Sequence, residues 1–148
     1  MKYSELKTAL VYAFERTGFS KNGKGLSRTG SGVVTVVNFN RGFGNQLFVD
    51  VGFWLSELGQ QIPRLTQHTH MYFRLERLVP ELGTVILTAG DLDDPSQDEA
   101  LGKLLQAMPM QVDSRLRQLA STSSLAAEFS TLQGLGIVTK EARDRLAP

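Results

Sequence analysis

The sequence predicts an α+β fold: an N-terminal helix, an antiparallel β-meander of about four to five strands, and C-terminal helices packed on one face of the sheet. Three observations lead to this class. Residues 4–16 repeat apolar side chains at helical spacing. Residues 33–88 contain strand-like segments whose connections are too short for helical crossovers, which favours antiparallel pairing. Residues 97–146 return to helical spacing, so we expect helices to cover the sheet.

The first helix is expected over residues 4–16. Ser4 is the predicted N-cap, and Gly18 is the residue predicted to end the helix. The apolar stripe of this helix consists of Leu6, Ala9, Leu10, Ala13 and Phe14. A glycine-rich region follows, in which we expect a short strand over Gly25–Arg28 and a turn over Thr29–Gly32.

Two long strands are predicted next, at Val33–Phe39 and Leu47–Leu55. Alternation in the second strand is strict, and one of its faces carries Leu47, Val49, Val51, Phe53 and Leu55. The other face carries Phe48, Asp50, Gly52 and Trp54. Because this second set mixes apolar and polar side chains, we expect that face to be partly open to water or covered by a helix.

The segment NFNRGFGNQ, residues 38–46, connects these two strands. A phosphate-binding glycine loop leads into a helix N-terminus, where free N–H groups converge on the anion. Here the glycines lead into a strand instead. We therefore interpret the segment as a hairpin bend whose glycines supply positive φ, with Arg41 as an exposed contact residue.

A third long strand is predicted at His70–Leu78, and a last short one at Thr84–Thr88 after the P-E-L-G turn. Side chains along a strand alternate between its two faces. Arg74 and Arg77 are an odd number of residues apart, so the prediction places them on opposite faces of the sheet.

The remainder of the chain is predicted to be helical. Pro95 and the acids around it mark the start of a helix that Pro109 is expected to end. A second helix continues over Val112–Leu119 after a kink, and further helices are expected at Ser123–Leu132 and Thr139–Leu146.

Length and composition restrict the class of protein. A chain of 148 residues with 41% hydrophobic and 21% charged residues suits a single soluble domain over residues 1–148, of which 133–148 is the least constrained part. No apolar stretch approaches the roughly 20 residues that span a bilayer, so we expect no membrane insertion. Glu5 and Glu15 interrupt the N-terminal apolar pattern, which argues against a signal peptide. The absence of cysteine fits a reducing cytoplasm.

The net charge of +1 is unevenly distributed. Residues 1–50 are basic and contain Lys21, Lys24, Arg28 and Arg41, whereas residues 51–100 are acidic. A dedicated nucleic-acid-binding protein is expected to have a stronger basic footprint, so the charge pattern disfavours that function.

Motifs for catalysis or metal binding are weak. His68 and His70 in QHTH are spaced like two metal ligands on one strand, but the sequence identifies no third ligand. Residues 91–99, DLDDPSQDE, lack the central glycine and terminal glutamate of a calcium-binding loop. No G-x-S-x-G elbow is present. We therefore predict no catalytic residue, no metal site and no cofactor.

Two sets of residues remain as candidates for recognition. Acidic and aromatic side chains on the surface are suited to covering a basic site on a protein partner. The candidates of this kind are Asp91, Asp93, Asp94, Asp98, Trp54 and Arg41. Alternatively, polar side chains on one sheet face would bind a small ligand or take part in metal-assisted hydrolysis. The candidates for this second role are Asn38, Asp50, His70, Tyr72 and Arg74.

The order of the motifs GFSKNGKGLSR, VVTVVNFNR, LFVDVGFWLSEL and HMYFRLERL resembles the bacterial domain-of-unknown-function family numbered 4304. The resemblance extends over about residues 5–130. Asn40 stands where that family often has glutamine, and Asp50 where asparagine is frequent. The resemblance implies a small bacterial cytoplasmic α+β domain and supplies no catalytic residue.

We expect a non-enzymatic protein-binding module. Comparable small domains neutralise toxins as immunity proteins, and by that analogy of class this chain would cover the basic active surface of a cognate toxin. The alternative is an enzyme or a ligand- or metal-binding domain that uses the polar sheet face.

Overall fold

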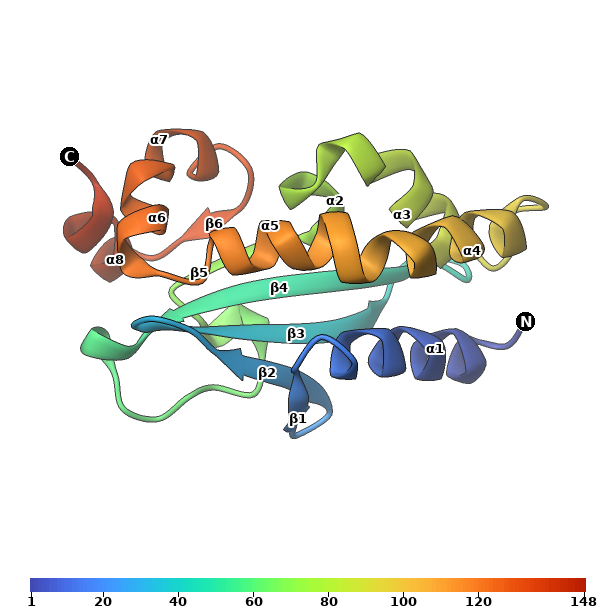
Figure 1. The fold of residues 1–148 in the computed structure, drawn as a ribbon, viewed down its shortest axis with the longest axis horizontal. Coiled ribbons are helices and arrows are strands. Elements are labelled where there is room, and N and C mark those ends of the chain that lie inside the picture. Colours follow the sequence, from blue (N-terminus) through green and yellow to red (C-terminus); the bar gives the residue numbers. More distant parts are fainter.

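The computed structural model describes all 148 residues and confirms the α+β class. Its six-stranded antiparallel sheet has the order β1-β2-β3-β4-β5-β6, so every strand lies beside its neighbour in sequence (Figure 1). The strands are β1 (Ser20–Asn22), β2 (Gly25–Thr29), β3 (Val33–Arg41), β4 (Leu47–Leu55), β5 (Met71–Arg74) and β6 (Ile137–Val138). The helices are α1 (Tyr3–Glu15), α2 (Leu75–Leu78), α3 (Gly83–Gly90), α4 (Gln97–Ala107), α5 (Asp113–Gln118), α6 (Thr122–Ala127), α7 (Phe129–Leu132) and α8 (Lys140–Leu146). None of them is long and apolar enough to cross a bilayer.

Helix α1 forms where its apolar spacing predicts it. The N-cap is Lys2 rather than Ser4: the Lys2 backbone N–H donates to Glu5 Oε1 (2.9 Å), while Ser4 lies inside the first turn. Gly18, with φ of 102°, turns the chain after the helix. The face that α1 buries consists of Leu6, Leu10 and Phe14.

Strands β3 and β4 pair along their whole length, from Val33 opposite Leu55 to Arg41 opposite Leu47. This register fixes two faces of the sheet. The first, here the helix face, carries the strictly alternating apolar residues of β4 and is covered by helices (Figure 1). The second, here the loop face, carries Asn38, Asp50 and the other even-numbered residues of β3 and β4.

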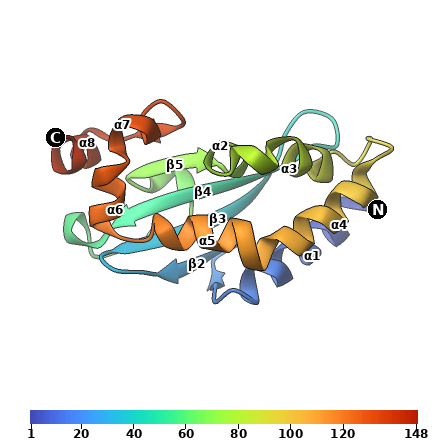
Figure 2. The ribbon, with the colours of Figure 1, turned by 45° about the horizontal axis from the view of Figure 1, so that its top comes forward.

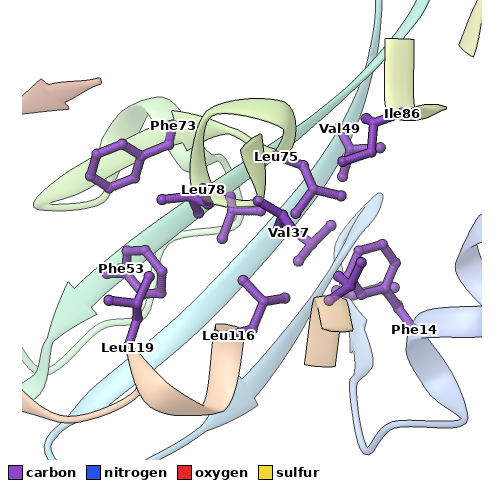
Figure 3. Packing of buried hydrophobic residues seen from close by; sticks show 14 of the residues in the cluster. Phe14, Val37, Val49, Phe53, Phe73, Leu75, Leu78, Ile86, Leu116 and Leu119 are labelled. Carbon is purple, nitrogen blue, oxygen red and sulfur yellow. The ribbon is translucent and has the colours of Figure 1, made fainter. Parts of the chain in front are cut away.

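The helix face forms one contiguous core of 32 buried residues. Figure 3 shows Leu116 and Leu119 of the α5 segment pointing toward the sheet, where Val37 and Phe53 lie. The rings of Phe53 and Phe73, from neighbouring strands, are 5.9 Å apart. Burial of each such side chain contributes about 1.5–3 kcal/mol, so the strands and helices stabilise each other through this layer.

One predicted strand is correct only in its first half, and another is wrong. The segment His70–Leu78 is a strand only up to Arg74, after which α2 begins, and Thr84–Thr88 lies inside helix α3. In α3 the buried residues are Ile86, Ala89 and Gly90, which is helical spacing. A short apolar run rich in β-branched residues cannot be assigned by periodicity alone, and here packing overrides strand propensity.

The edge beside β5 is filled from the C-terminal part of the chain. Ile137 and Val138 form β6, which pairs with Tyr72 and Met71, so segment 133–148 adds a strand that the sequence did not indicate. Helix α8 follows, with the Thr139 hydroxyl accepting the Ala142 N–H (3.2 Å) as N-cap. Strand β1 was also not predicted; it pairs with β2 through a turn at Gly23.

The long C-terminal helices are interrupted. Helix α4 ends at Ala107, close to Pro109 as predicted, and Pro109 itself lies in a wide helical turn, Met108–Val112, that leads into α5. Proline has no N–H to donate, so the helix loses a hydrogen bond there and widens. The predicted helix Ser123–Leu132 is divided into α6 and α7 at Glu128.

Candidate functional site

The loop face is divided into a covered half and an open half. The segment between β4 and β5, residues 56–70, runs across one half, away from the β3–β4 hairpin (Figure 1). Its carbonyls at Pro63 and Arg64 accept the side-chain amides of Asn22 and Asn38 at 3.0 Å each. No α-helix therefore covers this face; the 56–70 segment, whose only helical parts are the short 3-10 turns Ser56–Leu58 and Thr66–His68, covers part of it.

Asn38, a candidate ligand-binding residue, has a structural role in the covered half. Besides donating to Arg64, it accepts the Thr66 N–H at Oδ1 (2.7 Å). Thr69 packs directly over Gly52, where a Cβ atom would collide with the threonine side chain. These contacts hold the 56–70 segment against β3 and β4.

His70 and Trp54 form a second structural pair in the covered half. The ring of His70 stacks on Trp54 with centroids 4.0 Å apart, and its Nδ1 accepts the Leu55 N–H (2.8 Å). Trp54 Nε1 donates to the Gly59 carbonyl (3.1 Å). Burial lowers the pKa of His70 below its ordinary value of 6.5, an effect that Glu141 partly opposes. The neutral ring is therefore the form that fits this site.

The open half carries a connected group of polar and aromatic side chains, here the open sheet patch: Asn40, Phe48, Asp50, Tyr72 and Arg74. Asn40 donates to Asp50 (2.5 Å), and Arg74 Nε lies 3.9 Å from the same carboxylate. The Arg74 guanidinium lies over the Phe48 ring at 3.6 Å. Burial raises the pKa of Asp50, while the hydrogen bond from Asn40 and the charge of Arg74 act in the opposite direction.

Arg74 separates two hollows on this half. The larger, of about 780 Å³, extends toward the hairpin and is lined by Arg41, Gly42, Phe43, Gln46, Phe48 and Arg74. The smaller, of about 390 Å³, extends toward β6 and is lined by Asp50, Tyr72, Phe73, Arg74, Arg77, Leu135, Gly136 and Ile137.

The β3–β4 hairpin and the acidic segment before α4 lie together at one end of the sheet (Figure 2). Arg41 donates to Asn45 Oδ1 (2.9 Å), and Asn45 Nδ2 donates to Asp93 Oδ1 (2.9 Å). The Leu92 N–H donates to the Asn45 carbonyl (3.1 Å). Arg41 and the acidic residues, which are some 50 positions apart in sequence, therefore belong to one surface.

The acidic residues differ in their use. Asp91 and Asp94 accept the backbone N–H groups of Asp93 (3.0 Å) and Ser96 (2.7 Å), so they shape the loop. Asp93 and Asp98 are exposed. The two outward carboxylates are thus carried on a segment whose turns are fixed by the other two.

Phe43 is the residue that the sequence reasoning missed. It lies at the tip of the hairpin and is 99% exposed. An aromatic residue between two glycines in a turn, G-F-G, was the available signal, because nothing in such a turn can cover the ring.

The two predicted residue sets are only partly assembled. Trp54 is near the far end of β4, roughly 23 Å along the strand from the hairpin, so it does not join the acidic surface. Of the polar sheet residues, Asp50, Tyr72 and Arg74 are together, whereas Asn38 lies under the 56–70 segment and His70 is the last residue of that segment. His68 is exposed, and no group of three His, Cys, Asp or Glu side chains is placed to hold a metal ion.

A six-stranded meander with helices on one face and a half-open second face defines the class: a small α+β protein with an exposed sheet surface. The chain belongs to the family described as a domain of unknown function, DUF4304, whose profile matches residues 10–118. The resemblance seen in the motifs is confirmed over this somewhat shorter range. Comparisons with curated proteins and with solved structures gave no significant match.

Proposed function

We propose that the chain is a non-enzymatic protein-binding module whose contact surface is the hairpin end of the sheet. This hairpin-end surface consists of Arg41, Phe43, Asp91, Asp93, Asp94 and Asp98. The observation that carries the proposal is the position of Phe43, whose ring is fully exposed at the tip of a hairpin held by hydrogen bonds.

An exposed aromatic ring on a fixed support is suited to anchoring a partner. The Gly42 N–H donates to the Gln46 carbonyl (2.8 Å), which closes the hairpin, and the Asn45 contacts attach it to the acidic loop. The backbone that carries Phe43 is therefore already ordered, so binding costs little conformational entropy there. Moving its ring into a partner's pocket contributes about 1.5–3 kcal/mol, the amount expected of an interface anchor.

The charges beside this anchor indicate the kind of partner. Asp93 is exposed on the acidic loop and Asp98 on the first turn of α4, and their carboxylates attract a basic surface during the encounter. Trp54, which we had assigned to the same interface, is stacked on His70 and stands apart. The proposed contact therefore combines one aromatic anchor with an acidic margin.

The specific form of this proposal is an immunity-type protein of the bacterial cytoplasm that covers the basic active surface of a toxin. It is supported by the acidic margin, since blocking a basic cleft requires opposite charge. The alternative, a ligand-binding or hydrolytic site made from the polar sheet residues, has less support. Asn38 and His70 use their polar atoms in internal hydrogen bonds, so these atoms are not free to bind a ligand.

The test is affinity capture from native host cells at low ionic strength, followed by binding kinetics with the identified partner. Phe43→Ala should weaken binding by at least about tenfold, mainly through faster dissociation. The double variant Asp93→Asn/Asp98→Asn should slow association and reduce its dependence on salt. Met110→Ala, another exposed apolar residue far from the hairpin in sequence, is the matched control.

Three results would contradict the proposal. The first is that no protein is retained at low salt, where charge attraction is strongest. The second is a partner that binds Phe43→Ala as tightly as the unaltered protein. The third concerns the immunity form alone: the captured partner fails to arrest growth when expressed by itself, or co-expression of this chain fails to relieve the arrest.

A further inference from the structure

The smaller hollow beside Arg74 exists because β5 changes into a helix. In a continued strand, Arg74 and Arg77 would point to opposite faces. The strand ends at Arg74 and α2 starts at Leu75, so the backbone turns by about 100° per residue from there. Leu75 and Leu78 then point into the core, and Arg77 lines the same hollow as Arg74. Two cationic side chains thus meet at one site.

The opposite wall of this hollow comes from the turn that precedes β6. Gly136 packs so closely against β5 that a Cβ atom there would collide with the Phe73 ring and the Tyr72 carbonyl. This approach places Leu135 and Ile137 beside Tyr72. Ile137 is 56% exposed, so the hollow has a free apolar surface next to its arginines.

The guanidinium groups of Arg74 and Arg77 have N–H donors that are free to bind a ligand. Stacking on Phe48 fixes the plane of the Arg74 guanidinium, whose approach to Asp50 is only 3.9 Å. The side chains of Arg74 and Arg77 make no hydrogen bond, and Arg77 has no ion-pair partner. Two guanidinium groups face one carboxylate, Asp50, which leaves the hollow with one uncompensated positive charge.

We propose that this hollow binds a small organic monocarboxylate, with the carboxylate between Arg74 and Arg77 and the apolar body against Tyr72 and Ile137. Guanidinium groups bind planar carboxylates through paired N–H donors. A single negative charge balances the site. A phosphate monoester brings a charge of about −1.5 to −2, which exceeds the single positive charge of the site. The volume of about 390 Å³ is within the range of small-molecule sites.

The probe is sodium benzoate, which combines a carboxylate with an apolar ring. It is titrated into the full ¹⁵N-labelled chain at constant ionic strength, and amide chemical shifts are recorded. We expect saturable shifts centred on Tyr72, Arg74, Arg77 and the Gly136–Ile137 turn, with a dissociation constant on the order of 10 mM for so small a molecule. Benzamide, the neutral analogue, should cause shifts that are at least about tenfold weaker.

Substitution of single arginines tests whether Arg74 and Arg77 bind the benzoate. Arg77→Gln, an exposed residue without internal partners, should weaken benzoate binding by about tenfold and leave the remaining spectrum unchanged. Arg74→Gln should weaken it similarly. The control is Arg16→Gln, which changes an exposed arginine at the C-cap of α1, outside the hollow; this variant should bind benzoate normally.

Four outcomes would overturn the inference: no saturation up to about 50 mM benzoate, equal shifts with benzamide, undiminished binding by Arg77→Gln, or tighter binding of phenyl phosphate than of benzoate. None of these results bears on Phe43 or the acidic loop. The ligand site and the proposed protein-binding function can therefore fail independently.

Discussion

An ion pair distant from the proposed sites provides the sharpest test of how this fold is held together. Arg28 of β2 donates to Asp113 at the start of α5 (2.5 Å) and to the Thr17 carbonyl after α1 (2.8 Å). Arg117 donates to the other oxygen of Asp113 (2.7 Å). The Arg28 and Asp113 side chains are only 9% and 13% exposed. This pair connects three elements that are far apart in sequence, and Asp113→Asn would remove its only negative charge.

The expected loss of stability follows from this burial. Removing one partner of a buried ion pair costs about 3–5 kcal/mol, because the other charge is left uncompensated. Since both side chains retain slight exposure, we expect about 3 kcal/mol. For a chain of this length, that loss lowers the melting temperature by about 6–12 °C. Arg117→Gln should cost no more than about 1 kcal/mol, since the Arg117 side chain is 58% exposed.

The assay is equilibrium unfolding in urea, followed by fluorescence of the lone tryptophan, Trp54, and by circular dichroism. The double variant Arg28→Met/Asp113→Leu should lose less stability than the sum of its single changes, because neither charge then remains buried alone. The reasoning is refuted if Asp113→Asn loses less than about 1 kcal/mol or matches Arg117→Gln. Coincidence of the two probes is needed for these free energies to be meaningful.

Three other predictions concern the loop face. Burial lowers the pKa of His70 in the folded protein. The stability that the neutral ring contributes is therefore complete above pH 6.5, the pKa of an unfolded histidine, and is lost as the pH falls through the lower pKa of the folded state. His70→Asn keeps an acceptor for the Leu55 N–H and should therefore reduce the loss of stability between pH 7.5 and 5.5 in urea titrations. Burial raises the pKa of Asp50 in the folded protein. The stability gained from its protonated form is therefore present below pH 3.8, the pKa of an unfolded aspartate, and is lost as the pH rises through the higher pKa of the folded state. Asp50→Asn should consequently keep or raise the free energy of unfolding at pH 7 by up to about 1 kcal/mol, and a clear loss would contradict this reading. Gly52→Ala should lower the free energy of unfolding by about 1–3 kcal/mol, because the added methyl group collides with Thr69. The double variant Gly52→Ala/Thr69→Ala should lose less stability than the sum of the losses in the two single variants.

The sequence predicted those elements in which buried side chains recur at a regular spacing within one segment. Strict alternation over Leu47–Leu55 gave β4 with its observed bounds, because a half-buried strand shows its two faces directly in the sequence. The run Thr84–Thr88 has strand-like composition, but it is a helix because α3 packs its Ile86 and Ala89 side into the core. The place beside β5 is taken by β6 instead, from more than 60 residues further along the chain.

The candidate site was predictable only in part, because the sequence identifies single residues but not which of them the fold brings together. The sequence identified Arg41 and Asp93 as exposed recognition residues, but only the fold places them on either side of Asn45. It identified Asn38 and His70 as polar sheet residues, but their use as supports for residues 56–70 depends on where an irregular segment crosses the sheet. Periodicity contains no information about such a crossing.

By itself, the sequence determined the α+β class, the long β3–β4 hairpin and which side of β4 is apolar, because these features depend on residues a few positions apart. The tertiary structure alone decided which half of the second face stays open, that Arg74 and Arg77 share a hollow, and that Arg28 meets Asp113 across 85 residues. Contacts of that kind depend on strand order and on where the chain leaves the sheet. These are settled by the packing of the whole core, which no single segment encodes.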